Sequence, residues 1–534
     1  MTEAQRGKMM LRHKTMRSHA AVRKHLKKRF DPKERLPKTV VVDSNGGWMS
    51  QWSNDFKALG IEILRSHVNL HPEPFDFQSL VVWARREGRE SELSQMGHVD
   101  REACRKVGFY GPFELPGTRL FLDFCADLVD RYGLDSLLMK GTVVDVKVCK
   151  ADGDKVRREK RSWRRICEEE LLMQQHRRFA PRRSERQALP NPTPPLSPQP
   201  TFKLTLGDGR TLSAKRVVAA MGPGPAFQGM RATRPFWAEE LALELAASLT
   251  SSPSAAAASS SYSSIMQHAS TLTRWLLSSQ NREQVRGKRV LVVGGGQTSA
   301  HLARLAVDCE AEVVTYCSRR PVTQKPFDID VDCMGDKRPD MLKKFVRMAP
   351  GERIAFNREM RGGGSMSGDV YHGHLMGKQE DGLDMAEGIQ VEEVRASEER
   401  KTRVATRSER RRNSAVLRHC RLAFSSQARW SEKDHQVQVR LDDRSRRSFD
   451  FVWMATGGIF DMYLVPLFAS LQEQHPIPCV NGLPDLQPDL SWAEGVPFHV
   501  MGAFAQLQLG PDALNLAGAR SGGVLVARSI RGES

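Results

Sequence analysis

Apolar residues occur along this chain in short runs that alternate with segments of helical spacing. Residues 39–47 (TVVVDSNGG) form a β-branched run closed by glycines, which predicts a buried strand and a turn. Residues 61–66 (IEILRS) predict a second short strand. Apolar residues in 120–132 recur at helical spacing and stop before Gly133, as expected for a helix. Residues 141–148 alternate as in a strand with one exposed face.

The same alternation continues in the second half of the chain. Residues 201–222 predict a hairpin and then a buried strand, and Asp208 with Gly209 marks the hairpin turn. The clearest strand–turn–helix unit lies at 287–307, and 451–458 (FVWMATGG) predicts another buried strand. Buried strands that alternate with helices predict the α/β class, with two Rossmann-like doubly wound parallel sheets.

The C-terminal part predicts a strand at 498–502 and then a helix. Gly510 and Pro511 would open this helix, because proline suits the first helical position, and it would run to about Arg528. The alternative for 510–528 is a C-terminal helix that only packs against the core.

Composition changes this picture in one respect, the distribution of charge. The net charge is +18, but residues 1–38, 154–186 and 395–412 carry +10, +6 and +5, so the remainder is close to neutral. The basic stretches lack interleaved aromatic residues, and zinc or helix-turn-helix signals are missing, so we do not expect nucleic-acid binding. The chain has no long uncharged apolar run, which argues against a membrane span.

Nine scattered cysteines without a CxxC pair predict reduced thiols and no metal site. We therefore expect a cytoplasmic protein, although the basic leader leaves a mitochondrial destination open. The sequence does not indicate an oligomeric state.

The strongest chemical signal is the glycine turn after the strand 289–293. Gly294 permits a tight turn, and Gly296 lets the backbone approach a pyrophosphate at the start of the following helix. Gln297 and Thr298 follow, and the small Ser299 and Ala300 stand in place of a third glycine and allow close packing of helix on strand. This context predicts a dinucleotide site.

The next predicted strand, 311–317, ends in Ser318, Arg319 and Arg320. Two guanidinium groups where an NAD site would have an acid favour a ribose 2′-phosphate, and hence NADPH. The alternative is a glycine-rich turn with surface arginines that binds nothing.

Several segments resemble the N-hydroxylating flavin monooxygenases, the lysine and ornithine N-monooxygenase group, and little-characterised FAD/NAD(P)-binding proteins related to them. The turn GGGQTSA and the strand ends AMG and ATG carry the resemblance, and so do further segments in the same order. These are 47–52 (GWMSQW), 64–74 (LRSHVNLHPEP), 325–330 (KPFDID), 481–484 (NGLP) and 507–515 (LQLGPDALN).

The resemblance implies a two-dinucleotide-binding-domain flavoprotein with disordered polar inserts. The implied division is a basic leader at 1–38, the first part of an incomplete FAD-binding domain at 39–230 with an insert at 151–200, a low-complexity insert at 251–264, an NADPH-binding domain at 265–394, a polar insert at 395–415 and the second part of the FAD-binding domain at 416–534.

The resemblance also implies site residues. Residues implied to hold NADPH or FAD are Gly294, Gly296, Gln297, Thr298, Ser299, Arg319, Arg320, Thr456, Gly457, Gly502, Gln508, Gly510 and Asn515, with Asp512 as a further neighbour of the flavin. Lys325, Asp328 and Asp330 follow the nucleotide-binding strand and are candidate catalytic residues, with a salt-bridged loop as the alternative.

The implied reaction uses FAD, NADPH and O₂ to oxygenate a small amine-type substrate. In that family a strand with the GxGxxG fingerprint for FAD comes before the segment similar to 39–52, but the 38 residues upstream contain one glycine, Gly7. Three explanations compete: the sequence is incomplete at its N-terminus, FAD is held through other contacts, or the protein has lost FAD. In the last case it would be a degenerate nucleotide-binding protein with a regulatory or interaction role.

Other candidate residues have ordinary structural interpretations. His71 lies in a turn-like segment and is expected to be structural, and His372 with His374 lacks a third ligand for a metal. Trp48 and Trp52 are spaced as on a packed helix face, with stacking on the flavin as the alternative. The loop 361–367 (RGGGSMS) is either a flexible lid or a mobile turn.

Overall fold

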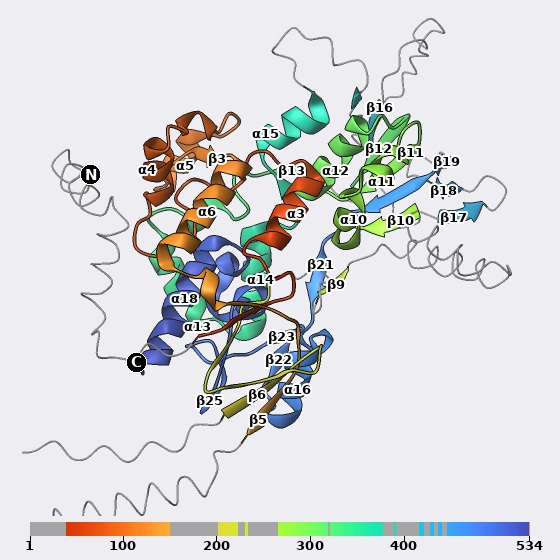
Figure 1. The fold of residues 1–534 in the computed structure, drawn as a ribbon. Helices are drawn as coiled ribbons and strands as arrows, with labels where there is room; N and C mark the ends of the chain where they lie inside the picture. The colour runs from red at the N-terminus through yellow and green to blue at the C-terminus, as the bar shows by residue number, and fades with distance from the viewer. Residues whose placement is uncertain are drawn as a thin grey trace, which may run out of the picture.

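The computed structural model describes ten stretches of the chain (Figure 1). They are residues 39–149, 201–222, 230–232, 265–318, 321–377, 389–390, 416–420, 428–431, 436–440 and 446–532. The basic leader, all three polar inserts, and Arg319 and Arg320 lie outside the described residues.

A six-stranded parallel sheet forms the part of the molecule that contains the predicted dinucleotide turn. Its strands are β10 (Met266–His268), β20 (Phe451–Met454), β11 (Arg289–Val293), β12 (Val313–Cys317), β16 (Val416–Cys420) and β15 (Ile389–Gln390), in that spatial order. All pairings are parallel. The strand order therefore runs one way from β11 through β12 and β16, and the other way through β20 and β10. This confirms the predicted Rossmann-like sheet.

Burial explains why these strands read as continuous apolar runs. Val290, Leu291 and Val292 in β11 are fully buried, as expected for a parallel strand covered on both faces. On one side lies α12 (Gln297–Asp308), whose Ala300 and Ala303 pack into the same core. Helices α10 (Ala269–Leu276) and α11 (Ser279–Glu283) precede β11 in the chain, and a small antiparallel sheet lies nearby: β17 (Ala428–Ser431), β18 (Gln436–Arg440) and β19 (Arg446–Phe449).

Residues 39–140 form a mainly helical part at the upper left of Figure 1. Its helices are α3 (Ser50–Leu59), α4 (Ser79–Arg86), α5 (Arg101–Lys106) and α6 (Thr118–Tyr132); β2 (Leu93–Gln95) pairs with β3 (Glu114–Pro116), and β1 (Val41–Asp43) pairs in parallel with β4 (Leu138–Lys140). Helix α6 ends at Gly133 in a left-handed conformation, which confirms the prediction. The predicted strand at 61–66 is wrong, because only Ile63 makes a β-bridge, to Gly117.

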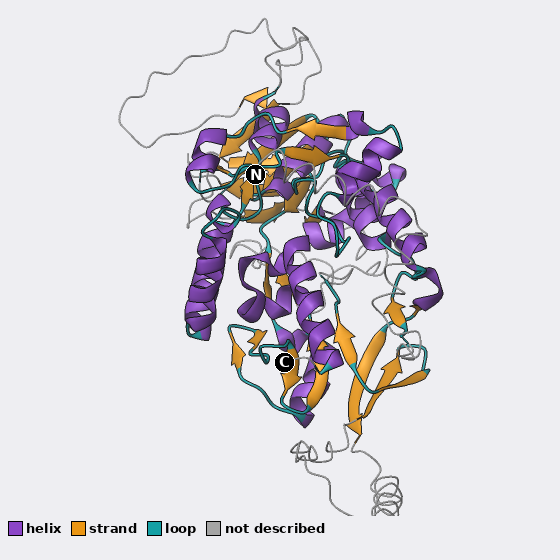
Figure 2. Ribbon diagram, turned by 90° about the vertical axis from the view of Figure 1, so that its left-hand side faces the viewer, coloured by secondary structure: helices purple, strands orange, loops and turns teal. Residues whose placement is uncertain are grey.

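The lower part of the molecule contains the predicted hairpin and a small mixed sheet. Antiparallel strands β5 (Val143–Cys149), β6 (Thr201–Leu206) and β7 (Thr211–Ala214) form one sheet, with Gly209 in the hairpin turn at a φ of 86°. Strand β8 (Val217–Ala219) pairs in parallel with β25 (Val496–Val500), which pairs with β24 (Ser491–Ala493). Figure 2 shows that helices accompany the strands in both the upper and the lower parts.

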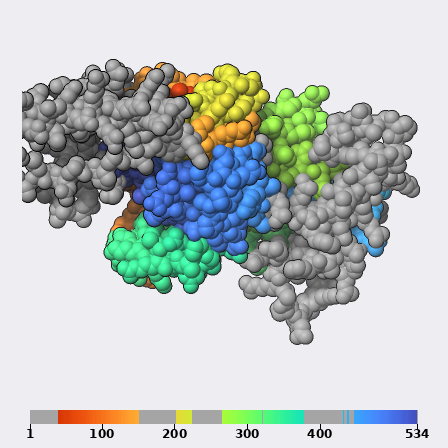
Figure 3. Space-filling view, turned by 90° about the horizontal axis from the view of Figure 1, so that it is seen from below, coloured from red at the N-terminus to blue at the C-terminus, as the bar shows by residue number. Residues whose placement is uncertain are grey.

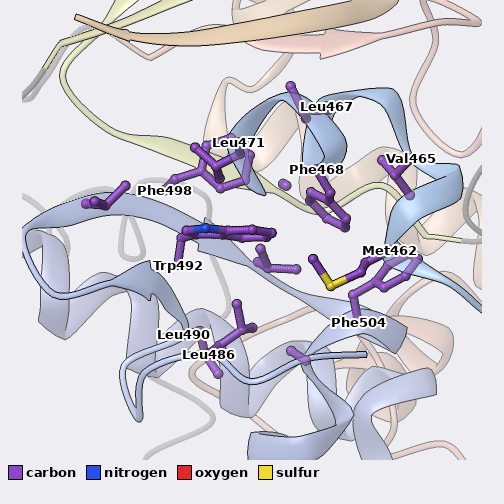
Figure 4. Packing of buried hydrophobic residues seen from close by; sticks show 14 of the residues in the cluster. Met462, Val465, Leu467, Phe468, Leu471, Leu486, Leu490, Trp492, Phe498 and Phe504 are labelled. Atoms are coloured by element: carbon purple, nitrogen blue, oxygen red, sulfur yellow. The ribbon is translucent and has the colours of Figure 1, made fainter. Parts of the chain in front are cut away.

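The largest aromatic cluster fills the core of this lower part. Helix α16 (Pro466–Gln474) places Phe468 against Trp492 of β24 and Phe498 of β25. Figure 4 shows the Trp492 ring between Phe498 on one side and Leu490 on the other. The buried indole donates its N–H to the carbonyl oxygen of His475 at 2.7 Å, so its polar atom is satisfied inside the cluster.

The C-terminal segment differs from the prediction at the start of its helix. Gly510 and Pro511 open a 3₁₀ turn, η7 (Gly510–Leu514), and the long helix α18 (Leu516–Arg531) begins after Asn515. Before them lie η6 (Gly502–Ala505) and α17 (Gln506–Leu509), and α13 (Arg338–Arg347) and α14 (Pro350–Arg361) flank the segment. Figure 3 shows the C-terminal residues in blue between the teal of α13 and α14 and the yellow of β6 and β7.

The remaining described elements are short. They are the strand pairs β9 (Met230–Ala232) with β21 (Gly458–Phe460), β13 (Thr323–Gln324) with β14 (Ser365–Met366) and β22 (Cys479–Val480) with β23 (Leu483–Pro484), the helix α15 (Gly368–Val370), the π-helix η4 (Tyr371–Met376) and the 3₁₀ turns η1 (Glu90–Glu92), η2 (Asp135–Leu137), η3 (Val331–Cys333) and η5 (Met462–Leu464). None of the described helices combines the length and apolar character needed to cross a bilayer. Across the same residues, His, Cys, Asp and Glu side chains form no cluster suited to a metal ion.

Candidate functional site

The predicted glycine turn lies where the strand order of the large sheet reverses. Gly294, Gly295 and Gly296, called here the nucleotide turn, connect β11 to the N-terminus of α12. The neighbouring strand β20 ends beside it, because a Cβ added to Gly294 would lie 2.4 Å from the carbonyl oxygen of Ala455. In open α/β sheets ligands bind at such a switch point, outside the carboxyl ends of the strands. The position of the turn therefore fits a dinucleotide site.

Close packing also accounts for the serine in place of a third glycine. Ser299 is fully buried and its hydroxyl donates to the carbonyl oxygen of Gly296 at 2.6 Å. The Ser299 hydroxyl oxygen also lies 3.0 Å from the hydroxyl oxygen of Tyr316 in β12. Burial raises the pKa of Tyr316. The phenol is therefore neutral, and it ties the second strand of the sheet to the nucleotide turn.

The structure also gives the environment of the other site residues predicted near the nucleotide turn. Gln297 opens α12 and accepts a hydrogen bond from the backbone N–H of Ser367 at 3.3 Å, while Thr298 is exposed. Thr456 and Gly457 follow β20, and the Gly457 carbonyl oxygen lies 3.0 Å from Nε2 of His268. Because the Ala455 carbonyl lies against Gly294, the structure brings the end of β20 beside a turn about 160 residues earlier in the chain.

The three candidate catalytic residues lie on the loop after β13, and each has a charged partner. Lys325 pairs with Asp330 at 3.0 Å, and Asp330 also accepts from the backbone N–H of Asp332. Asp328 pairs with Arg361 at 3.3 Å. These contacts match the alternative of a salt-bridged loop, and a catalytic role for the three residues stays a prediction.

Asp328 and Asn515, two predicted site residues far apart in the sequence, lie close together. The amide nitrogen of Asn515 is 3.5 Å from Asp328 Oδ2 and donates to Asp512 Oδ1 at 2.9 Å. Arg361 also donates to the carbonyl oxygen of Pro511 at 3.0 Å. The loop after β13 therefore contacts the segment predicted to face the flavin.

Within that segment the polar side chains mainly hold backbone in place. The Asn515 side-chain oxygen caps α18 by accepting from the N–H groups of Ala517 and Gly518. The Gln508 amide donates to the carbonyl oxygen of Leu486, and its own oxygen is buried without a partner. Gly502 and Gly510 adopt positive φ angles of 74° and 76°, which glycine tolerates.

The structure also shows two residues that the sequence alone did not single out. Arg65, from the helical part, is partly buried and donates to the carbonyl oxygens of Lys325, Phe327 and Ser365. Burial lowers its pKa to about 10, and the like charge of Arg361 adds to this, while Asp328 opposes it. A single arginine in an irregular segment carries no sequence signal for such contacts.

The second missed residue is Asp43, at the carboxyl end of β1. Its Oδ1 accepts from the backbone N–H groups of Asn45 and Gly46 at 2.8 and 2.9 Å. An open hollow of about 640 Å³ adjoins it. The residues that line this hollow are Ser44, Met139, Lys140, Gly141, Thr142, Gly207, Asp208 and Arg210. An acid directly after a β-branched run was the available signal, since such acids bind ribose hydroxyls in nucleotide folds.

The histidines considered in the sequence analysis contact other side chains in the structure. His71 is fully buried, and burial lowers its pKa to about 4, so it is neutral and packs against Phe124. His374 contacts His301, and His372 stacks on His98 with ring centroids 4.2 Å apart. Trp52 stacks on Phe56 within α3, but Trp48 precedes the N-cap Met49, so the prediction of a shared helix face is wrong for Trp48.

A six-stranded parallel sheet with a glycine turn where its strand order reverses defines a Rossmann-like α/β protein. Its fold is similar to that of FAD-dependent N-hydroxylating monooxygenases of known structure. The cadaverine monooxygenase DfoA from Erwinia amylovora, solved with FAD, matches with a TM-score of 0.52 and 14% identity over 94% of this chain and 90% of that chain. The fold predicted from the resemblance is thereby confirmed.

Two further solved structures give the same result. Ornithine hydroxylase PvdA from Pseudomonas aeruginosa has a TM-score of 0.51 and 13% identity over 92% of each chain. L-lysine 6-monooxygenase from Pseudomonas syringae has a TM-score of 0.50 and 15% identity over 92% of this chain and 91% of that chain. No protein-family model and no curated protein sequence matches this chain.

Proposed function

We propose that this protein is an NADPH-dependent, FAD-linked monooxygenase that uses O₂ to oxygenate a small amine-type substrate at nitrogen. The observation that carries the proposal is the likeness of fold to an FAD-bound amine monooxygenase over at least nine tenths of both chains. The nucleotide turn at the switch point of the parallel sheet supports it independently, because that turn fits a dinucleotide.

The residues around the nucleotide turn fit NADPH. The N-terminal N–H groups of α12 would face a pyrophosphate bound at the turn, and the helix dipole would favour its negative charge. Gln297 and Thr298 would lie beside the phosphates. Arg319 and Arg320 would bind the ribose 2′-phosphate, because planar guanidinium groups pair with phosphate oxygens.

The residues for FAD are divided between the helical part and the C-terminal part. Asp43, beside the hollow at the ends of β1 and β4, would bind the ribose hydroxyls of FAD. The segment from Gly502 to Asn515 would lie against the flavin ring, and the unpartnered buried oxygen of Gln508 offers an acceptor for a flavin N–H. When bound, FAD would supply the redox chemistry of the reaction, with NADPH as the reductant and O₂ as the oxidant.

The chain's own residues would position the reactants and exclude water. Arg361 and Asn515 both donate to the Asp328 carboxylate, so the loop after β13 is joined to α14 and to the C-terminal segment. In this proposal Asp328 would attract the cationic form of an amine or accept its proton. Lys325, paired with Asp330, would balance negative charge near the nicotinamide side.

The test is a spectroscopic and kinetic assay of the purified full-length chain incubated with FAD. We expect a stoichiometric flavin band near about 450 nm that NADPH bleaches in the absence of O₂. In air, cadaverine, ornithine or lysine should increase NADPH consumption and yield a hydroxylamine.

A matched pair of variants makes this test specific to the turn. Gly294→Ala places a Cβ 2.4 Å from the Ala455 carbonyl oxygen, so it should abolish flavin reduction by NADPH. Gly523→Ala, where a Cβ meets nothing within 4 Å, should leave reduction unchanged. A folded wild-type chain that binds neither flavin nor NADPH would refute the proposal. Binding of NADPH without flavin would instead indicate a nucleotide-binding protein without this redox activity.

A further inference from the structure

We propose that Gly362, Gly363 and Gly364, called here the glycine loop, form a gate over the nucleotide turn that must open to admit a dinucleotide pyrophosphate. The inference rests on the proposed function, in which NADPH is that dinucleotide. It adds a conformational step at the same site, and it assigns this step to three residues that carry no side chains.

The glycine loop occupies the space that a pyrophosphate would need. A Cβ on Gly296 would lie 3.5 Å from the Cα of Gly364, and a Cβ on Gly364 would lie 3.3 Å from the Gly295 carbonyl carbon and the Gly296 nitrogen. The second glycine of a dinucleotide turn leaves room for the backbone to approach the pyrophosphate. Because the backbone of Gly364 fills that room, loop and pyrophosphate exclude each other in this conformation.

The loop has the backbone freedom that a gate requires. Helix α14 ends at Arg361, and Gly362 and Gly363 adopt φ angles of 68° and 70°, in the left-handed region. All three glycines are exposed, and a Cβ on Gly363 would meet nothing within 4 Å. Glycine passes between left- and right-handed conformations at little cost, so these residues can change direction without moving α14.

The residues on both sides of the glycine loop are anchored, which limits the movement to the loop itself. Before it, Arg361 is held by Asp328 and by the carbonyl oxygen of Pro511. After it, Ser365 pairs with Thr323 between β14 and β13, and Arg65 donates to both its carbonyl oxygen and its hydroxyl. The contacts between loop and turn are, in contrast, close approaches of backbone atoms.

A closed gate lowers the apparent affinity for the dinucleotide. If only a fraction of molecules has the loop open, the apparent dissociation constant is the intrinsic one divided by that fraction. A substitution that crowds only the closed state should therefore tighten binding. Gly364→Ala is such a substitution, since its Cβ presses on the nucleotide turn while its backbone φ lies outside the left-handed region.

The experiment measures binding of NADP⁺ and of adenosine 2′-phosphate to the full chain by titration calorimetry. The second ligand has the 2′-phosphate but no pyrophosphate, so the gate should not affect it. We expect Gly364→Ala to lower the Kd for NADP⁺ by at least about threefold, with no change for adenosine 2′-phosphate. The control Gly351→Ala in α14, where a Cβ meets nothing within 4 Å, should behave as wild type with both ligands.

Hydrogen exchange of the wild type provides an independent readout. Opening predicts that NADP⁺ slows exchange in a peptide covering 294–300 and speeds exchange in one covering 362–367. Slower exchange in both peptides would show that the loop is a fixed wall of the site, and the gate would be refuted.

The outcomes separate the gate from the proposed function. NADP⁺ binding that is equal or weaker in Gly364→Ala, in a variant with unchanged melting temperature, overturns the gate and leaves the function in place. Binding by Gly364→Ala alone supports the gate. Failure of both wild type and variant to bind NADP⁺ overturns the gate and the function together.

Discussion

At the scale of single residues, burial decides the charge of the histidines near the nucleotide turn. His301 lies on α12, and its Nδ1 is 3.1 Å from Nε2 of His374 on η4, so one imidazole donates to the other. Burial lowers the pKa of His301 to about 3, and His374 adds to this effect. Burial also lowers the pKa of His374. Both rings are therefore neutral at neutral pH.

This pair predicts a loss of stability in mild acid. Below about pH 6.5 the unfolded chain binds a proton on His301 that the folded chain does not, so the free energy of unfolding falls as pH decreases from about 6.5 toward 3. Above that range this contribution is complete. The expected size is about 1.4 kcal/mol for each pH unit and group.

We expect His301→Asn to reduce the dependence of the melting temperature on pH between 7 and 5, whatever its effect on absolute stability. Melting temperatures recorded at several pH values would check this. Parallel curves for wild type and variant would contradict the assigned role of His301.

At the scale of an element, helix α18 shows that tertiary contacts decide whether a sequence signal for the start of a helix is used as one. Pro511 suits the first position of a helix, and the structure uses it in the 3₁₀ turn η7 instead. The helix proper begins after Asn515, whose side chain caps it. The tight turn back is permitted by Gly518, because a Cβ there would lie 2.1 Å from the carbonyl oxygen of Asp512.

Two glycines on α18 give a matched pair for this prediction. Gly518→Ala forces η7 away from the helix and should lower the free energy of unfolding by about 3 kcal/mol. Gly523→Ala meets open space and should be neutral or raise it by up to about 1 kcal/mol through helix propensity. Urea denaturation of both variants would measure the difference in the free energy of unfolding. Equal free energies would contradict the close packing of η7 against α18.

At the scale of the whole molecule, Arg65 joins parts of the chain that lie about 260 and 300 residues apart. Its guanidinium group donates to three carbonyl oxygens and to the Ser365 hydroxyl, beside β13 and β14. A buried charge of this kind is held by hydrogen bonds to backbone, and Asp328 supplies the nearby negative charge.

Removing this contact should destabilise the molecule as a whole. Arg65→Met leaves three partly buried carbonyl oxygens without their donor and should lower the free energy of unfolding by about 3 kcal/mol. Arg85→Met is the control, because Arg85 is exposed and forms a surface pair with Glu90 that should contribute less than about 1 kcal/mol. Similar melting temperatures for the two variants would count against the bridging role of Arg65.

Much of the local structure was predictable because it depends on neighbouring residues. The strand at 289–293, its glycine turn and the helix after it follow from apolar runs and glycine conformation, and so does α6 with Gly133 at its end. The strand predicted at 61–66 was wrong because an extended segment forms a strand only when it pairs with a neighbouring strand. Here only Ile63 makes a β-bridge, to Gly117.

The sequence by itself determined the α/β class and the glycine turn after the strand 289–293, since periodicity and glycine placement are local properties. Only the tertiary structure decided that Gly364 lies against Gly296, that Asn515 lies near Asp328 and that Arg65 holds the loop after β13. These contacts join residues far apart in the chain, and their energies arise from packing and desolvation, which no local pattern records.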